Sequence, residues 1–214
     1  MELNLIQKVA VFALPVIFAI TLHEAAHGYA ALRFGDRTAQ MMGRISANPL
    51  RHIDLVGTII VPAITIVLGG ILFGWAKPVP VNFGNLRNPK KDMFWVAAAG
   101  PLANLAMAVF WAGVIKFAFS VPSAYSHPLA LMGMAGVTIN AILATLNLLP
   151  IPPLDGGRIA VSLLPHKWSY KLAQVEPYGL FILIGLLATG LLGLIIGPFY
   201  QTVEQVLLHI FNIP

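Results

Sequence analysis

Three residues early in the chain, His23, Glu24 and His27, have the types and the spacing of a metal-dependent hydrolytic site. Two histidines four residues apart face the same way on a helix and can share one Zn²⁺, while the glutamate between them reaches the water that the metal activates. The neighbouring residues are apolar, and a charged side chain at the centre of a bilayer costs about 2.5–3.5 kcal/mol, so polar residues there indicate function. The other interpretation is a helix end at the membrane surface, where these side chains meet headgroup water.

Two imidazoles leave a catalytic zinc site short of one protein ligand, which is normally a histidine or a carboxylate. Most of the eight acidic residues lie near the termini or beside basic connections. Asp155 instead follows the apolar, proline-containing run 147–154 and precedes two glycines. Prolines break a helix, and glycines permit a turn that aims the carboxylate inward. We therefore predict that Asp155 is the third ligand; the alternative is an ordinary residue at a helix end.

The composition predicts that these side chains lie in an integral membrane protein with several spans. Of the 214 residues, 58% are hydrophobic and 10% are charged, against about 25% charged in a typical globular chain. The net charge of +5 could suggest nucleic acid as a partner, but Lys and Arg lie in short connections, as is typical of cytoplasmic loops. We expect the lipid bilayer as a partner and no nucleic acid. The absence of cysteine excludes disulfides and thiolate ligands.

The positions of the uncharged runs predict an all-α polytopic membrane protein with about five apolar helical segments, one of them re-entrant. We expect a single membrane-embedded domain, 1–214, with a catalytic core at about 15–160 and C-terminal helices at about 177–212. The five runs are 9–32, 55–76, 93–115, 117–154 with a break near 121–128, and 177–203.

Two arguments predict that segment 55–76 enters and leaves the membrane on one side. Four, four and three of the 13 Lys and Arg residues lie in the connections after the first, second and fourth runs, and a re-entrant segment places all three connections on one face. Both the histidine pair and Asp155 come late in their segments, so these segments must be parallel to bring the ligands together. The site is then expected on the cytoplasmic side of the cell membrane.

The two motifs together resemble the site-2 protease family of intramembrane zinc metalloproteases. The second motif of that family is present as Asn147, Pro150, Pro152, Leu154, Asp155 and Gly156, and similar stretches are 43–54, 77–82 and 100–104. The resemblance covers about residues 15–160 and suggests a minimal member without a PDZ or CBS domain. It implies that His23, His27 and Asp155 bind one zinc ion per chain, that Glu24 is the general acid/base, and that Asn147 lies beside the substrate.

The resemblance implies an intramembrane zinc metalloendopeptidase that cleaves a transmembrane segment of another membrane protein. The alternative from a different class is a membrane zinc-binding protein without proteolytic activity, either a metal carrier or an inactive scaffold. A carrier should show a series of ligands across the bilayer, and an inactive relative would usually lack Glu24.

Two further features concern the surroundings of the site. Asn104 and Asn140 could support the zinc ligands by hydrogen bonds or could simply join neighbouring helices. Segments 43–54 and 78–82 are expected to form short extended strands near the site, to which a substrate could add as a further strand.

Overall fold

The computed structural model describes residues 5–52, 54, 60 and 77–213, and the regular structure in these residues is helical. The elements are α1 (Leu5–Phe34), α2 (Thr38–Met41), η1 (Pro49–Arg51), η3 (Phe83–Asn85), α4 (Pro89–Ala118), α5 (Ser123–Asn147), α6 (Asp155–Leu163), α7 (His166–Ala173), η4 (Glu176–Tyr178), α8 (Gly179–Ala188) and α9 (Leu191–Ile210).

The start of α4 illustrates how the sequence sets a helix boundary. Pro89 occupies the first turn, where its missing N–H would have no partner within the helix. The carboxylate of Asp92 accepts a hydrogen bond from the backbone N–H of Asn88 at 2.8 Å. This contact gives the N–H of the residue before the helix a side-chain acceptor, and an acidic group in the first turn also stabilises the helix dipole.

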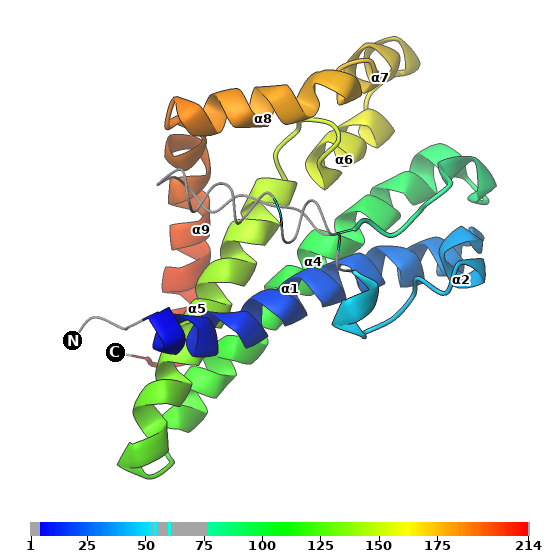
Figure 1. Cartoon of the computed structure of the whole chain (residues 1–214). Coiled ribbons are helices and arrows are strands. Elements are labelled where there is room, and N and C mark those ends of the chain that lie inside the picture. Colours follow the sequence, from blue (N-terminus) through cyan, green and yellow to red (C-terminus); the bar gives the residue numbers. More distant parts are fainter. Residues whose placement is uncertain (1–4, 53, 55–59, 61–76, 214) are drawn as a thin grey trace.

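Helices α1, α4 and α5 pack together as the central bundle (Figure 1). Small residues bring α4 and α5 close: a Cβ atom added at Gly136 would lie 2.2 Å from Cγ of Trp111, and one added at Gly133 would lie 2.5 Å from the Ile115 side chain. Close backbone approach at small residues is how helices associate in lipid. Helix α9 contributes Leu207 to the same buried cluster.

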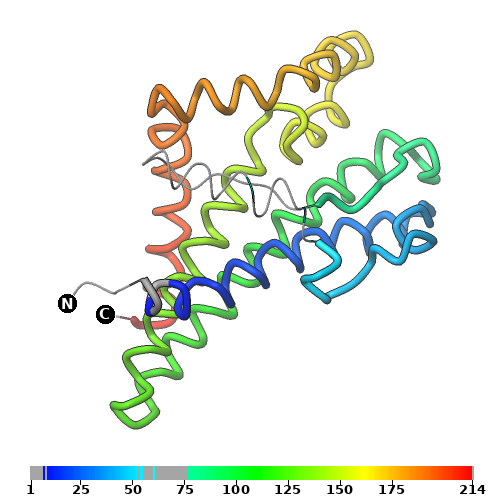
Figure 2. Tube along the Cα trace, in the orientation of Figure 1, coloured from blue at the N-terminus to red at the C-terminus, as the bar shows by residue number. Residues whose placement is uncertain are grey.

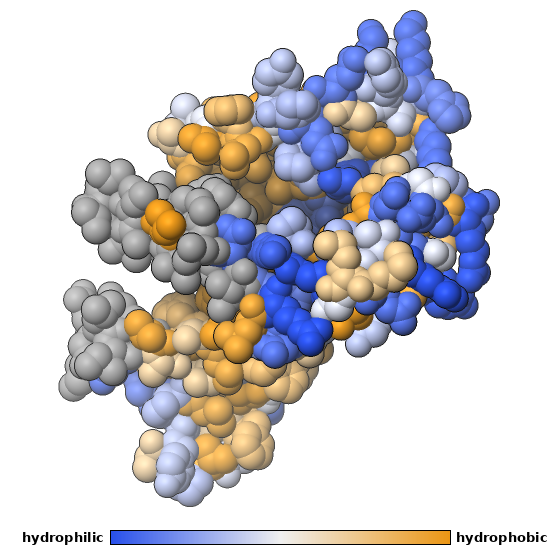
Figure 3. All heavy atoms as spheres, turned by 45° about the vertical axis from the view of Figure 1, so that its right-hand side comes forward, coloured by the Kyte–Doolittle hydropathy of each residue, from blue (hydrophilic) through white to orange (hydrophobic). Residues whose placement is uncertain are grey.

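Five helical stretches in the described part of the chain are long and apolar enough to cross a membrane, which confirms the predicted all-α polytopic membrane architecture. Hydrophobic side chains cover much of the face in Figure 3, and hydrophilic ones gather towards the side that holds α2 and the start of α4. The five stretches are Val9–Phe34, Pro89–Ala118, Ser123–Asn147, His166–Ala188 and Leu191–Ile210.

The last apolar run does not form one segment as expected. It divides into α8 and α9 at Gly190, whose φ of +75° lies in the left-handed region that glycine adopts without strain. Helix α9 continues through 204–210 and so extends a candidate span beyond the apolar run 177–203.

The predicted short strands are absent from the described residues. Segments 44–48 and 77–81 have no regular structure, and the link between them is made by a side chain: Nη2 of Arg44 donates to the carbonyl of Lys77 at 2.9 Å. Pro78 and Pro80 have no backbone N–H and cannot donate to a ladder. Two extended segments therefore lie in contact without becoming a sheet.

The directions of the long helices agree with the prediction that the two segments carrying the proposed ligands run parallel. Helices α1 and α5 both start at the end of the bundle that holds the chain termini, and α4 runs in the opposite direction (Figure 2). The re-entrant segment predicted at 55–76 falls outside the described residues except for position 60.

Candidate active site

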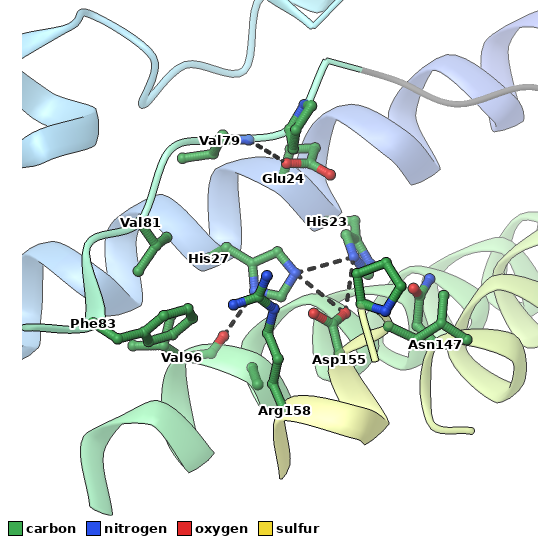
Figure 4. A pocket seen from close by; sticks show the side chains of 14 residues that line it. His23, Glu24, His27, Val79, Val81, Phe83, Val96, Asn147, Asp155 and Arg158 are labelled. Carbon is green, nitrogen blue, oxygen red and sulfur yellow. Dashed lines mark hydrogen bonds and ion pairs between the residues drawn. The ribbon is translucent and has the colours of Figure 1, made fainter. Parts of the chain in front are cut away.

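The two histidines and the aspartate predicted as metal ligands converge on one point (Figure 4). His23 and His27 lie on one face of α1, with their Nε2 atoms 3.1 Å apart. Oδ2 of Asp155, the first residue of α6, lies 3.2 Å from Nε2 of His23 and 3.3 Å from Nε2 of His27. Within the part of the chain that the structure describes, these three residues form the group of His, Asp and Glu side chains whose ligand atoms lie close enough to hold a metal ion.

The spacing of these three atoms fits zinc. Bonds of about 2.0–2.1 Å to nitrogen and oxygen place tetrahedral ligands about 3.3–3.4 Å apart, and the observed separations are 3.1–3.3 Å. Three protein ligands leave the fourth position of a tetrahedron open, which is the arrangement of a catalytic site and not of a structural one.

The other nitrogen of each imidazole fixes which atom faces the metal position. Nδ1 of His27 lies 2.7 Å from the carbonyl oxygen of Val96, which can only accept a hydrogen bond, so Nδ1 carries the proton. Nε2 of His27 then presents a lone pair to the cluster. The same conclusion holds for His23, whose Nδ1 lies 2.6 Å from Oδ1 of Asn104.

A chain of hydrogen bonds through three helices determines which way the oxygen and the nitrogen of the Asn104 amide point. Nδ2 of Asn104 donates to the carbonyl of Ala19 at 3.1 Å and to Oδ1 of Asn140 at 3.0 Å. Nδ2 of Asn140 donates to the carbonyl of Gly136 at 2.8 Å. Because backbone carbonyls end both branches, the Oδ1 atom of Asn104 is the acceptor for His23. Three lone pairs therefore face one another at the cluster; a proton joins only two of these atoms, whereas a metal ion binds all three.

Gly100 on α4 leaves the space that the two imidazoles occupy. A Cβ atom at this position would lie 2.4 Å from Nε2 of His27 and 2.6 Å from Nε2 of His23. The sequence indicates close helix packing at Gly100 and nothing that assigns it to the site. Its role is steric, and it follows from a contact between residues more than 70 positions apart.

Two glycines after Asp155 allow α6 to start against the preceding turn. A Cβ atom at Gly156 would lie 2.2 Å from the carbonyl oxygen of Leu148, and one at Gly157 would lie 2.3 Å from the backbone nitrogen of Pro152. Both glycines are helical and buried. They therefore aim the Asp155 carboxylate through close packing of the backbone, and not through the flexible turn expected from the sequence.

Glu24 lies beside the cluster and lines a cavity of about 420 Å³ together with the three predicted ligands. Its Oε2 accepts a hydrogen bond from the backbone N–H of Val79 at 2.7 Å (Figure 4). This contact joins α1 to the segment 78–81, which forms one wall of the cavity. The sequence predicted the glutamate but not its backbone partner.

Asn147, the predicted substrate-binding residue, also lines the cavity. It is the last residue of α5, and its Nδ2 donates to the carbonyl of Leu143 at 3.0 Å. One amide proton and the amide oxygen are left for another partner. Arg158, which was not predicted as a site residue, lines the same cavity. Its position three residues after Asp155 was the signal that both share a face of α6.

Asp36 fixes the cavity wall to the end of α1. The buried carboxylate accepts hydrogen bonds from the backbone N–H of Thr38 at 3.0 Å and of Asn82 at 2.7 Å, and from the side chain of Asn85 at 3.2 Å. Burial acts to raise the pKa of Asp36, but the hydrogen bonds from Thr38, Asn82 and Asn85 outweigh it and lower the pKa below its usual value. The group is therefore an anion that holds segment 82–85 in place.

Known proteins with related sequences support a metal-dependent protease. A protein of Bacillus subtilis (strain 168) named "Putative zinc metalloprotease YwhC" is 36% identical over 201 residues, which cover 92% of this chain and 89% of that protein. The family model described as "Peptidase family M50" matches residues 111–189, a range that includes Asn147 and Asp155. The chain belongs to peptidase family M50.

A second relative also has a metalloprotease name. A protein of Mycolicibacterium smegmatis named "Putative zinc metalloprotease Rip2" is 35% identical over 188 residues, which cover 85% of this chain and 69% of that protein. No solved structure matches the chain with significance. Family M50 is the site-2 protease family that the two motifs resemble, so the expected family is confirmed. As an M50 protein with five candidate spans, the chain is a multi-pass membrane metalloprotease with zinc as its metal.

Proposed function

We propose that this metalloprotease is an intramembrane endopeptidase that cleaves transmembrane segments of other membrane proteins near the cytoplasmic face. The observation that carries the proposal is the position of the metal cluster. His23 and His27 belong to the candidate span Val9–Phe34, and their ligand atoms face Asp155 and a cavity that Glu24 also lines. A cluster at this depth reaches peptide bonds that lie within a bilayer.

Each residue of the site has a proposed role. His23, His27 and Asp155 hold one zinc ion, which when bound polarises the scissile carbonyl and lowers the pKa of water towards about 7. Glu24 removes a proton from the attacking water and returns it to the leaving amine. The Val79 N–H holds one oxygen of the Glu24 carboxylate at 2.7 Å and leaves the other oxygen for the water.

Asn147 is proposed to bind the substrate from the end of α5. Its free amide proton can donate to a peptide carbonyl or to the oxyanion that develops during attack. The charge distribution supports a site towards the cytoplasm, because the basic connections lie at the end of the bundle where α1 ends and α6 begins.

The test compares the wild type with Glu24→Gln during co-expression with a panel of tagged single-span membrane proteins. The substitution removes the base but none of the proposed ligands, so we expect about one zinc per chain in both forms and a loss of cleavage of about 10²–10⁴-fold. Glu204→Gln is the matched control. Glu204 accepts a hydrogen bond from Thr138, away from the cavity, and a glutamine oxygen can accept it as well. Substantial cleavage by Glu24→Gln would contradict the mechanism, and zinc binding without cleavage by the wild type would favour a non-proteolytic zinc protein.

A further inference from the structure

Arg158 brings a guanidinium group into the wall of the cavity. It lies on α6 three residues after Asp155 and therefore on the same face of the helix. Figure 4 shows its side chain rising from α6 towards His27 and Phe83. Among the described residues that line the cavity, Arg158 carries the guanidinium, and Glu24 and Asp155 carry the carboxylates.

Two contacts hold this guanidinium in place. Its Nη2 donates to Oε1 of Glu176 at 2.8 Å, and its Cζ lies 4.9 Å from the centre of the Phe83 ring. The stacked, paired arrangement preorients a planar group with five N–H donors. Within the described residues, one of these donors is used by Glu176, so others are left for a molecule in the cavity.

The opposite wall of the cavity is poor in hydrogen-bond donors. Pro78 and Pro80 have no backbone N–H. The N–H of Val79 is taken by Glu24, and the N–H of Asn82 is taken by Asp36. Among the described residues this leaves the N–H of Val81, which lines the cavity, as the free backbone donor of segment 78–82. A peptide that lay against this wall would find one backbone donor for its own carbonyl oxygens.

An unwound substrate needs such donors. A peptide bond in a transmembrane helix must leave its helical hydrogen bonds before water can attack it, and each unsatisfied carbonyl in lipid costs several kcal/mol. Because segment 78–82 offers one free backbone donor, further compensating hydrogen bonds have to come from side chains in the cavity, where Asn147 and Arg158 carry N–H groups. The guanidinium of Arg158 is positioned there.

We propose that Arg158 is a substrate-binding residue that donates hydrogen bonds to backbone carbonyl oxygens of the unwound peptide next to the scissile bond. The inference rests on the proposed function and adds a residue to it. Residues three apart on a helix have Cβ atoms about 5–6 Å apart, and an extended peptide advances about 3.3 Å per residue. The contacted carbonyl thus lies within about two residues of the bond that is cut.

The test measures binding separately from cleavage, in the full chain carrying Glu24→Gln. The probe is a fluorescent synthetic membrane-spanning peptide of leucine and alanine, about 20 residues long, with Gly and Pro at its centre. Affinity is measured in lipid nanodiscs by energy transfer from a dye on the protein. We expect Arg158→Gln to weaken binding about 10–100-fold, as for the loss of hydrogen bonds from a charged donor. Arg158→Lys should be intermediate, because lysine keeps the charge but not the planar fork.

Glu176→Gln is the control that separates substrate binding from a structural ion pair. A glutamine oxygen still accepts from Arg158, so peptide affinity should change less than about threefold, and zinc content should be the same in all variants. Equal losses in Arg158→Gln and Glu176→Gln, or unchanged affinity in Arg158→Gln, would overturn the role of Arg158. Either result would leave the proposed function standing. If the Glu24→Gln protein binds no membrane-spanning peptide, the proposed function fails and the role of Arg158 fails with it.

Discussion

Nδ1 of His23 and Oδ1 of Asn104 lie 2.6 Å apart although the two residues are separated by 81 positions in the chain. Asn104 is fully buried, and its amide is itself held by Ala19 and Asn140. The contact sets the tautomer and the direction of the imidazole, which determines whether Nε2 points at the metal position.

The first prediction concerns this contact. Asn104→Ala removes the acceptor for His23, so zinc affinity should fall about 10–100-fold, as for other partners of metal-binding histidines. Zinc binding is measured by competition with a chelator in purified protein. Asn48→Ala, at an exposed position, is the control and should bind zinc normally. Excess zinc should restore occupancy in Asn104→Ala; affinity equal to that of the wild type would show that the amide only joins helices.

The second prediction concerns the space at Gly100. A methyl group there would lie 2.4 Å from Nε2 of His27, so Gly100→Ala should greatly reduce the zinc content while the protein keeps its helical content. Gly113→Ala on the same helix is the control, because its added Cβ meets only the Phe211 ring at 3.8 Å. Alanine also has the higher helix propensity, by about 1 kcal/mol. A normal zinc content in Gly100→Ala would mean that the imidazoles have room to move.

The sequence alone predicted those parts of the site that depend on local spacing or on scarcity. His23 and His27 are one helical turn apart, and Asp155 is an acid in an apolar run with no other reason to hold one. Gly100, Asn104 and Val79 could not be assigned in this way. Each acts through a contact with α1 made across a distance of more than 50 residues, and nothing near them in the sequence marks that contact.

The fold was predictable to a similar extent. Hydropathy located the long helices because lipid requires about 20 apolar residues per span. The division at Gly190 and the absence of strands at 77–81 depended on backbone conformation, which hydropathy does not report. In the second case, the prolines were the available signal, because they remove the donors that a ladder needs.

The third prediction is a pH dependence of stability that arises from Asp36. Its pKa is lowered in the folded protein, so its contribution to stability is present above the unfolded value of about 3.9 and is lost as the pH falls through the folded pKa. Asp36→Asn should therefore lower the free energy of unfolding at pH 7 by about 1–3 kcal/mol, which is measured as a lower thermal unfolding temperature. The difference from the wild type should shrink as the pH falls below about 3.9 and through the folded pKa. A difference that stays constant over this range would contradict the assignment.

The fourth prediction concerns orientation in the membrane. Single cysteines are clean probes because the chain has none. Cysteines replacing the exposed residues Gln40, Asn85 and Tyr170 should react with an impermeant thiol reagent only from the cytoplasmic side, and one replacing Tyr125 should react only from outside. Tyr125 lies at the start of α5, at the far end of the bundle from the ligand cluster. Labelling of position 85 from outside would place the segment that forms the cavity wall on the outer side of the membrane and would contradict a cytoplasmic site.

The last prediction concerns the substrate. If peptide bonds must unwind before they reach the cavity, the cost of unwinding enters the rate, and residues with low helix propensity near the scissile bond reduce it. Gly lowers helix stability by about 1 kcal/mol and Pro by about 3 kcal/mol relative to Ala. Replacing such residues with Leu in a cleaved single-span protein should slow cleavage about fivefold or more, because 1.4 kcal/mol corresponds to a factor of ten. Turnover is followed by gel shift of the tagged product. The same replacements placed about ten residues away along the span are the control, since they change composition without stabilising the bond that is cut. Equal rates across such a series would show that unwinding does not limit cleavage, and the need for compensating donors in the cavity would lose its kinetic basis.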